Sequence, residues 1–179
     1  MGYSLFINLF NNIEVYSPTF GFYVSLVLIV FLLYVSGMMS ASEIAFFSLS
    51  PKDISIIDEE HTIKDSRIKM LRLDSERTLA TILITNNFVN VTIIMLCNYC
   101  FEKIIDFHDS VILQFLIVTI LLTFLLLLFG EVMPKIYSAQ KPLRFCRTSV
   151  GFILVVRKLF WPIESLLLYS RLLAEKIVQ

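Results

Sequence analysis

Residues 20–49 read FGFYVSLVLIVFLLYVSGMMSASEIAFFSL, and this apolar stretch decides the class of fold. It contains no Lys or Arg, and Glu43 is its only charged residue. Because about 20 helical residues cross a hydrocarbon core of about 30 Å, the stretch is long enough to span a membrane. Its second half, from Ser36 to Glu43, is rich in small and polar side chains. We therefore expect a transmembrane helix whose second half faces other helices or water rather than lipid.

Two further apolar segments, about residues 79–100 and 111–129, are also long enough to span. Only helices and closed barrels satisfy their backbone groups in lipid, and these segments lack the strict alternation of barrel strands. Hydrophobic residues make up 57% of the chain and charged residues 17%, whereas soluble domains have about 45–50% and about 25%. The sequence thus predicts an all-α membrane protein with three transmembrane helices and argues against a soluble domain.

The basic residues predict the orientation of these helices. Residues 1–49 contain none, residues 50–78 contain six, residues 101–110 contain Lys103 alone, and the chain after Phe129 contains eight. Lys and Arg are retained on the cytoplasmic side of a membrane. A topology with the N-terminus outside and the C-terminus cytoplasmic therefore places fourteen of the fifteen basic residues inside. With no basic residue before it and a long apolar run, the first span is a retained helix rather than a signal peptide.

The segments between and after the spans carry mixed charges. Residues 50–78 combine charged side chains with isoleucine and leucine, which predicts short amphipathic helices at the membrane surface. In residues 138–179 two basic residues interrupt the apolar run, so we expect a pair of interfacial helices kinked near Pro162; a fourth span over about 150–170 is the alternative. The predicted domains are a three-helix transmembrane domain, 1–137, which includes the cytoplasmic loop 50–78, and a juxtamembrane amphipathic belt, 138–179, which leads to a cytoplasmic domain missing from this chain.

Polar side chains recur within the expected spans, where each one is costly and is therefore a candidate functional residue. Ser36, Ser40 and Glu43 are spaced i, i+4 and i+7, so they share one face of a helix. Asn86 and Asn90 lie one turn apart on the second span. Close packing and hydrogen bonding between helices would explain both clusters, and so would oxygen atoms offered to a cation. Both interpretations stay open at this point.

A third polar cluster, GEVMPK from Gly130 to Lys135, is expected to close the third span. Pro134 cannot donate a backbone hydrogen bond, so the carbonyls of Gly130 and Glu131 are expected to lose their partners. Freed carbonyls beside a carboxylate would form a site of hard oxygens; alternatively, the segment simply ends the span with Lys135 at the interface. Hydroxyl, amide, carbonyl and carboxylate oxygens together suit Mg²⁺, Ca²⁺ or Na⁺ better than Zn²⁺ or Cu⁺.

Other reactive side chains give weaker signals. Cys97 and Cys100 lie within the second span and are expected to pack in the core, and His61 and His108 are expected on the solvated surface. No combination of nucleophile, base and orienting group is evident, so we expect no enzymatic activity. The 15 basic and 15 acidic residues cancel, which leaves no net field to attract nucleic acid.

Three motifs together resemble the transmembrane domain of the cyclin M/CorC family of magnesium transporters. They are SGMMSASEIA at Ser36–Ala45, NNFVN at Asn86–Asn90 and FGEVMPK at Phe129–Lys135, and they fall in the expected order on the expected helices. The resemblance implies a homodimer in a lipid bilayer, with three transmembrane helices per subunit and a belt of short juxtamembrane helices. It also implies that Mg²⁺ binds between the helices at serine, asparagine and glutamate oxygens.

Carried over by motif, the implied metal ligands are Ser36, Ser40, Asn86, Asn90 and Glu131, and the implied supporting residues are Gly37, Glu43, Gly130, Pro134 and Lys135. Family members usually continue into a cytoplasmic CBS-pair module, so the resemblance implies that this chain is a truncated membrane domain, and the Ser-Ala-Ser-Glu motif favours a bacterial inner-membrane protein. Thr85 stands where many relatives have glycine. The expected function is a secondary transporter that exports Mg²⁺ in exchange for Na⁺. The alternative is a membrane module that senses cations or anchors a partner without transport.

Overall fold

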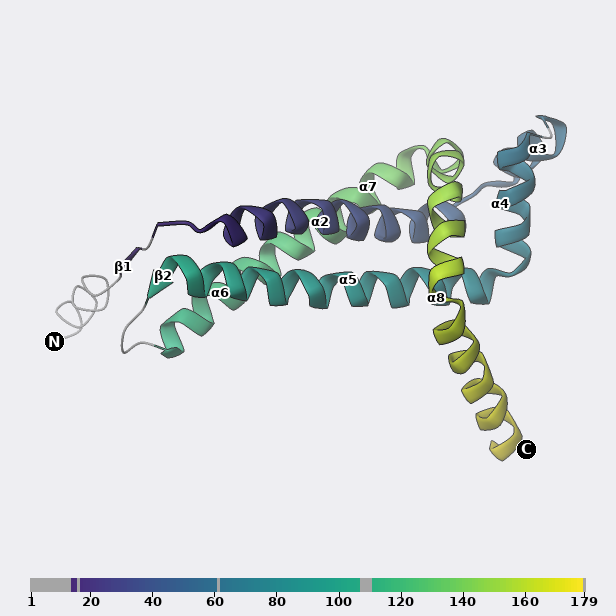
Figure 1. Ribbon diagram of the computed structural model, residues 1–179. Coiled ribbons are helices and arrows are strands. Elements are labelled where there is room, and N and C mark those ends of the chain that lie inside the picture. The colour runs from purple at the N-terminus through teal and green to yellow at the C-terminus, as the bar shows by residue number, and fades with distance from the viewer. Residues whose placement is uncertain (1–13, 16, 61, 107–110, 179) are drawn as a thin grey trace, which may run out of the picture.

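The computed structural model describes residues 14–15, 17–60, 62–106 and 111–178, which form an almost entirely helical chain (Figure 1). The elements are, in chain order, β1 (Glu14–Val15), α2 (Phe20–Phe47), α3 (Pro51–Glu60), α4 (Ile63–Leu73), α5 (Ser75–Ile104), β2 (Ile105–Asp106), α6 (Val111–Leu125), the π-helix η1 (Leu126–Val132), α7 (Met133–Gln140) and α8 (Pro142–Val178). Among these residues, three helical segments are long and apolar enough to cross a membrane: Phe20–Phe47, Ser75–Ile104 and Phe115–Gln140. The predicted all-α membrane fold with three spans is confirmed.

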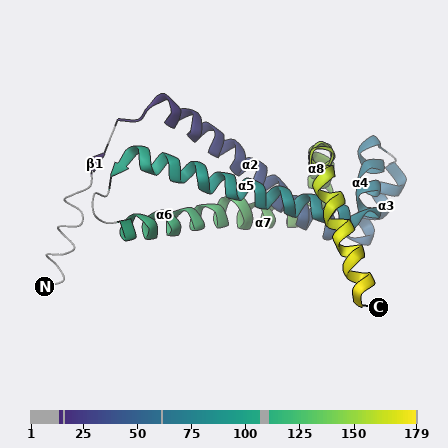
Figure 2. The same ribbon diagram turned by 60° about the horizontal axis from the view of Figure 1, so that its bottom comes forward.

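The spans are not evenly packed along their length. Figure 2 shows α2, α5 and α6 spread apart at the end nearer the N-terminus and converging toward α7 and α8. At the spread end, β1 pairs with β2 in antiparallel fashion, with Glu14 opposite Asp106 and Val15 opposite Ile105. The three spans therefore approach one another more closely toward the end that meets α7 and α8.

The third span differs from its predicted form because it does not end at the Gly130–Lys135 motif. The helix widens into the π-helical η1, in which the backbone N–H of Met133 donates to the carbonyl of Leu128, five residues earlier. Pro134 then falls in the first turn of α7, where a missing N–H is tolerated. The prediction that the motif closes the span is wrong, and the helix continues to Gln140.

The tail also differs from its predicted form. Instead of a helix pair, residues 142–178 form the single helix α8, which passes through Pro162 without a break. Figure 1 shows that α8 changes direction along its length and crosses the ends of α2 and α5 at a steep angle. It is not among the three candidate spans found in the described residues, so nothing supports the alternative of a fourth span.

A separate apolar core lies where α8 meets the loop between the first two spans. Ile57 of α3 and both Ile68 and Leu71 of α4 are buried against Cys146 and Val150 of α8. The two helices α3 and α4 are the amphipathic helices predicted for residues 50–78. Their apolar faces therefore cover α8 and the end of α2 rather than standing free.

Two ion pairs fix α8 to the two ends of α4. Asp65, which is fully buried, closes a capping box with Thr62 at the start of α4, and Arg147 donates to its carboxylate from Nε at 2.8 Å and from Nη2 at 3.1 Å. Arg157 pairs with Asp74 at the other end of α4. Burial raises the pKa of Asp65, but the hydrogen bonds from Arg147 and Thr62 outweigh it, so the pKa lies below its usual value.

Replacement of Asp65 by Asn is expected to lower the free energy of unfolding by about 1.5–3 kcal/mol, since it weakens the charged hydrogen bonds of a buried carboxylate while Arg147 keeps Glu60 as a second partner at 2.7 Å. Because the folded-state pKa is lowered, the stabilisation is present above the unfolded-state pKa of about 3.9 and is lost as the pH falls through the folded value. Thermal unfolding in detergent between pH 3 and 7 measures both effects. Asp58→Asn is the matched control, because the Asp58 side chain, paired with Lys69, is 56% exposed; equal losses in the two variants would contradict this account.

Candidate cation site between the transmembrane helices

The second half of α2 carries three buried hydroxyl groups. Ser36, Ser40 and Ser42 are all almost completely shielded from solvent, although they lie on a helix whose first half is apolar. Ser42 satisfies its hydroxyl within the helix by donating to the carbonyl of Met38 at 2.6 Å. Ser36 and Ser40 do not do this, and their surroundings define the candidate site.

Ser36 links α2 to α5 through two asparagines that the sequence predicts as metal ligands. Its Oγ lies 2.8 Å from Oδ1 of Asn86 and 2.8 Å from Oδ1 of Asn90. A hydroxyl has one proton and donates to one acceptor at a time. Two amide oxygens therefore compete for one hydroxyl proton, and the oxygen that does not receive it can accept a positive charge at this position.

Gly130 brings the main chain of η1 to the same point. A Cβ atom at residue 130 would lie only 3.1 Å from Oγ of Ser36, and a Cβ at Gly37 would lie 3.0 Å from Cγ of Pro134 and 3.4 Å from the carbonyl oxygen of Phe129. The two glycines thus let α2 and the third span approach closely. The contact falls within or next to the π-helical turn, a distortion that is frequent at functional sites.

Ser40 lies one helical turn from Ser36 and is 1% exposed. Among the described residues its Oγ has no hydrogen-bond partner. An unsatisfied buried polar group costs about 1–3 kcal/mol, so a ligand that contacts this hydroxyl would stabilise the folded state. Thr85 of α5, by contrast, satisfies its hydroxyl within its own helix by donating to the carbonyl of Thr81 at 2.7 Å.

The acidic residues of the predicted set form a separate group. Oε1 of Glu131 lies 2.9 Å from Nζ of Lys135, and Oε2 of Glu43 lies 3.4 Å from the same nitrogen. The structure therefore brings together Ser36, Asn86, Asn90 and Gly130, whereas Glu131 is engaged by Lys135. Its role as a metal ligand stays a prediction.

The sequence pattern does not predict the π-helical turn. Gly130 followed by Pro134 is the available signal, but this pattern indicates the end of a helix more readily than a change in its hydrogen bonding. The pairing of Glu43 with Lys135 was also missed, because it joins two spans 92 positions apart and has no local pattern.

Other candidate positions are less suited to a cation. Cys97 and Cys100 are free thiols within a buried apolar cluster, and His61 and His108 lie outside the described residues. The described residues hold no group of three or more His, Cys, Asp or Glu side chains able to bind a metal. A cation held between these helices would therefore depend largely on hydroxyl and amide oxygens.

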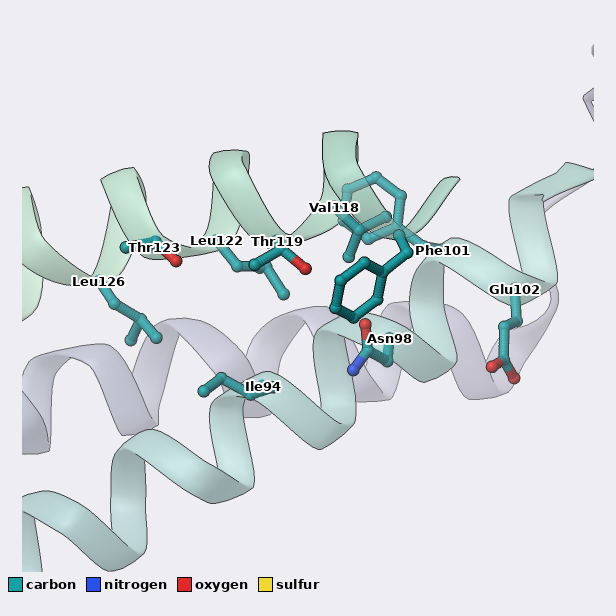
Figure 3. A pocket seen from close by; sticks show the side chains of 10 residues that line it. Ile94, Asn98, Phe101, Glu102, Val118, Thr119, Leu122, Thr123 and Leu126 are labelled. Carbon is teal, nitrogen blue, oxygen red and sulfur yellow. The ribbon is translucent and has the colours of Figure 1, made fainter. Parts of the chain in front are cut away.

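A cavity of about 500 Å³ lies between α5 and α6, toward the spread end of the bundle. Figure 3 shows that Asn98, Thr119 and Thr123 are its neutral polar groups, set among apolar side chains, and that Glu102 lies at one edge, away from the two threonines. The cavity lacks the convergent oxygens found around Ser36, so it is the weaker candidate.

Comparison with known proteins agrees with the motifs. The family model for the cyclin M transmembrane N-terminal domain matches residues 27–178. Metal transporter cnnm-4 of Caenorhabditis elegans is 28% identical over 147 residues, an alignment that covers 79% of this chain and 30% of that protein. The chain thus corresponds to under a third of the length of this relative. With three candidate membrane spans and a family match over most of its length, the chain is a multi-pass membrane protein that belongs to the cyclin M transmembrane domain family.

Proposed function

We propose that this protein is a secondary transporter that moves Mg²⁺ through the oxygen cluster between α2, α5 and η1. The observation that carries the proposal is the contact of Ser36 Oγ with two amide oxygens at 2.8 Å, one turn from the unpartnered Oγ of Ser40. Mg²⁺ prefers oxygen ligands and retains several waters in proteins. The name of the relative, a metal transporter, points the same way.

The donor set fits a cargo that must be released as well as bound. Ser36, Ser40, Asn86 and Asn90 supply neutral oxygens, and we propose that Glu131 supplies one carboxylate. Several fixed neutral oxygens replace part of the water shell of Mg²⁺, whereas a cage of carboxylates would hold the ion too firmly for transport. We propose Na⁺, a second hard cation, as the coupling ion for export.

Access to the site from alternate sides requires the helices around it to move. Gly37, Gly130 and Pro134 lie where α2 crosses the third span, and we propose that they absorb this movement. The π-helical η1 supports this role, because a turn that already departs from regular hydrogen bonding is easier to reshape.

We further propose a homodimer in the inner membrane of a bacterium, joined in the full-length protein to a cytoplasmic CBS-pair module. The N-terminus would lie outside and the C-terminus inside. Figure 1 supports this orientation, because α3, α4 and α8 all lie at the end of the spans away from the N-terminus. These helices carry most of the basic residues, which are retained on the cytoplasmic side.

Mg²⁺ is expected to raise the melting temperature of the protein in detergent, since a ligand at about 100 times its Kd stabilises the folded state by about 2.7 kcal/mol. Ser36→Ala and Asn90→Ala are each expected to abolish this shift, because each removes an oxygen from the cluster. Ser42→Ala is the matched control: it removes a buried serine hydroxyl that bonds within its own helix, and it should keep the wild-type shift. The same shift in all four proteins would rule out a site at the cluster.

Transport is expected in liposomes loaded with a Mg²⁺-sensitive dye, with an imposed Na⁺ gradient driving Mg²⁺ movement. Asn90→Ala and Glu131→Gln are each expected to reduce the rate at least tenfold, because both remove a proposed ligand. Mg²⁺ binding without flux in the wild type would instead favour the sensing or anchoring module. Wild-type flux in both variants would disprove the proposed route.

A further inference from the structure

One cation of the chain itself lies next to the proposed site. Nζ of Lys135 is shared by carboxylates from two elements, Glu131 of η1 at 2.9 Å and Glu43 of α2 at 3.4 Å. The group of three carries a net charge of −1 while the lysine is in place. The carboxylates of Glu43 and Glu131 are thus held together by a positive charge that the chain supplies.

The group of Glu43, Glu131 and Lys135 lies close to the oxygen cluster, a short distance further along the same helical segments. Glu43 is one turn beyond Ser40 on the same face of α2, about 10 Å along the helix axis from Ser36. Glu131 directly follows Gly130, which packs on Ser36. The carboxylates therefore lie between the buried oxygens and the end of the spans where α3, α4 and α8 are found.

The charged group and the oxygen cluster differ in how far their side chains are exposed. The side chains of Lys135, Glu43 and Glu131 are 28%, 30% and 46% exposed, whereas Ser36 and Ser40 are almost fully buried. Charged groups at membrane depth face the interior of a bundle or a water-filled cavity rather than lipid. The carboxylates that Lys135 holds are therefore more accessible to an approaching cation than the buried oxygens are.

We infer that Lys135 is a tethered counter-cation that competes with the transported ion for the carboxylates of Glu43 and Glu131 and so limits the affinity of the site. A lysine ammonium is a compact charge on a flexible four-carbon stem, so it can swing away and return. When it leaves, the two carboxylates regain a charge of −2, which matches a divalent ion. When it returns, its charge helps to release that ion.

This inference rests on the proposed function and identifies Lys135 as a residue that sets the affinity of the site rather than a ligand. It makes two predictions of opposite sign. Lys135→Met removes the competitor and should lower the Kd for Mg²⁺ about tenfold, or about 1.4 kcal/mol. Lys135→Arg replaces it with a guanidinium that grips carboxylates through paired hydrogen bonds, so it should raise the Kd several-fold. A lysine with a purely structural role would give weaker binding in the methionine variant and near wild-type binding in the arginine variant.

Isothermal titration of the 179-residue chain in detergent with MgCl₂ tests the inference. Lys141→Met, the same substitution at an exposed lysine after α7, is the matched control and should keep the wild-type Kd. An unchanged or raised Kd in Lys135→Met, or an unchanged or lowered Kd in Lys135→Arg, would overturn the inference. If the methionine variant does not fold, the arginine variant alone decides.

The Asn90→Ala variant separates this result from the proposed function. If Asn90→Ala abolishes binding but both Lys135 variants match the wild type, the site stands and the counter-cation is disproved. If the wild type binds no Mg²⁺, or if Asn90→Ala binds it as the wild type does, then the proposed site and the inference both fail.

Discussion

The close approach of α2 to the third span is the constraint on which the rest of the structure depends. Ser36 and Gly37 leave so little space that a Cβ at Gly130 or at Gly37 would meet the opposite helix at 3.0–3.1 Å. Helices in a membrane associate through dispersion contacts rather than the hydrophobic effect. Small residues favour this association because they let the backbones approach closely. The π-helical turn at Leu126–Val132 lies at this contact, so tight packing and irregular backbone occur together.

That contact explains why polar groups are tolerated at this depth. Ser36 meets its acceptors on α5 at 2.8 Å, whereas Ser40, one turn away, meets none among the described residues. In a medium of low dielectric constant such a group is costly and a satisfied network is strongly favoured. A bundle optimised only for stability would carry an apolar side chain at the position of Ser40. The unpartnered hydroxyl of Ser40 is therefore an argument for a ligand that is polar and small.

The sequence predicted the parts of this arrangement that depend on local pattern. The three spans followed from the length of the apolar runs, and the shared face of Ser36 and Ser40 followed from helical spacing. The course of the chain through Gly130 and Pro134 did not follow, because a proline signals a helix end unless the preceding turn changes its hydrogen bonding, as it does at Met133. The ion pairs of Lys135 could not be predicted from the sequence either, since they depend on how two spans are placed against each other.

The oxygen cluster is also connected by packing to α8. Met39 of α2, Ile82 of α5 and Val156 of α8 form one buried apolar group. Met39 adjoins Ser40, and Ile82 is one turn before Asn86, so the group supports both helices of the site from one side. Because protein interiors are close-packed, a movement of α8 would also displace Met39 and Ile82, and with them the helical turns that carry Ser40 and Asn86. The ion pairs that fasten α8 to α4 through Arg147 and Arg157 therefore help to set the geometry of the oxygens.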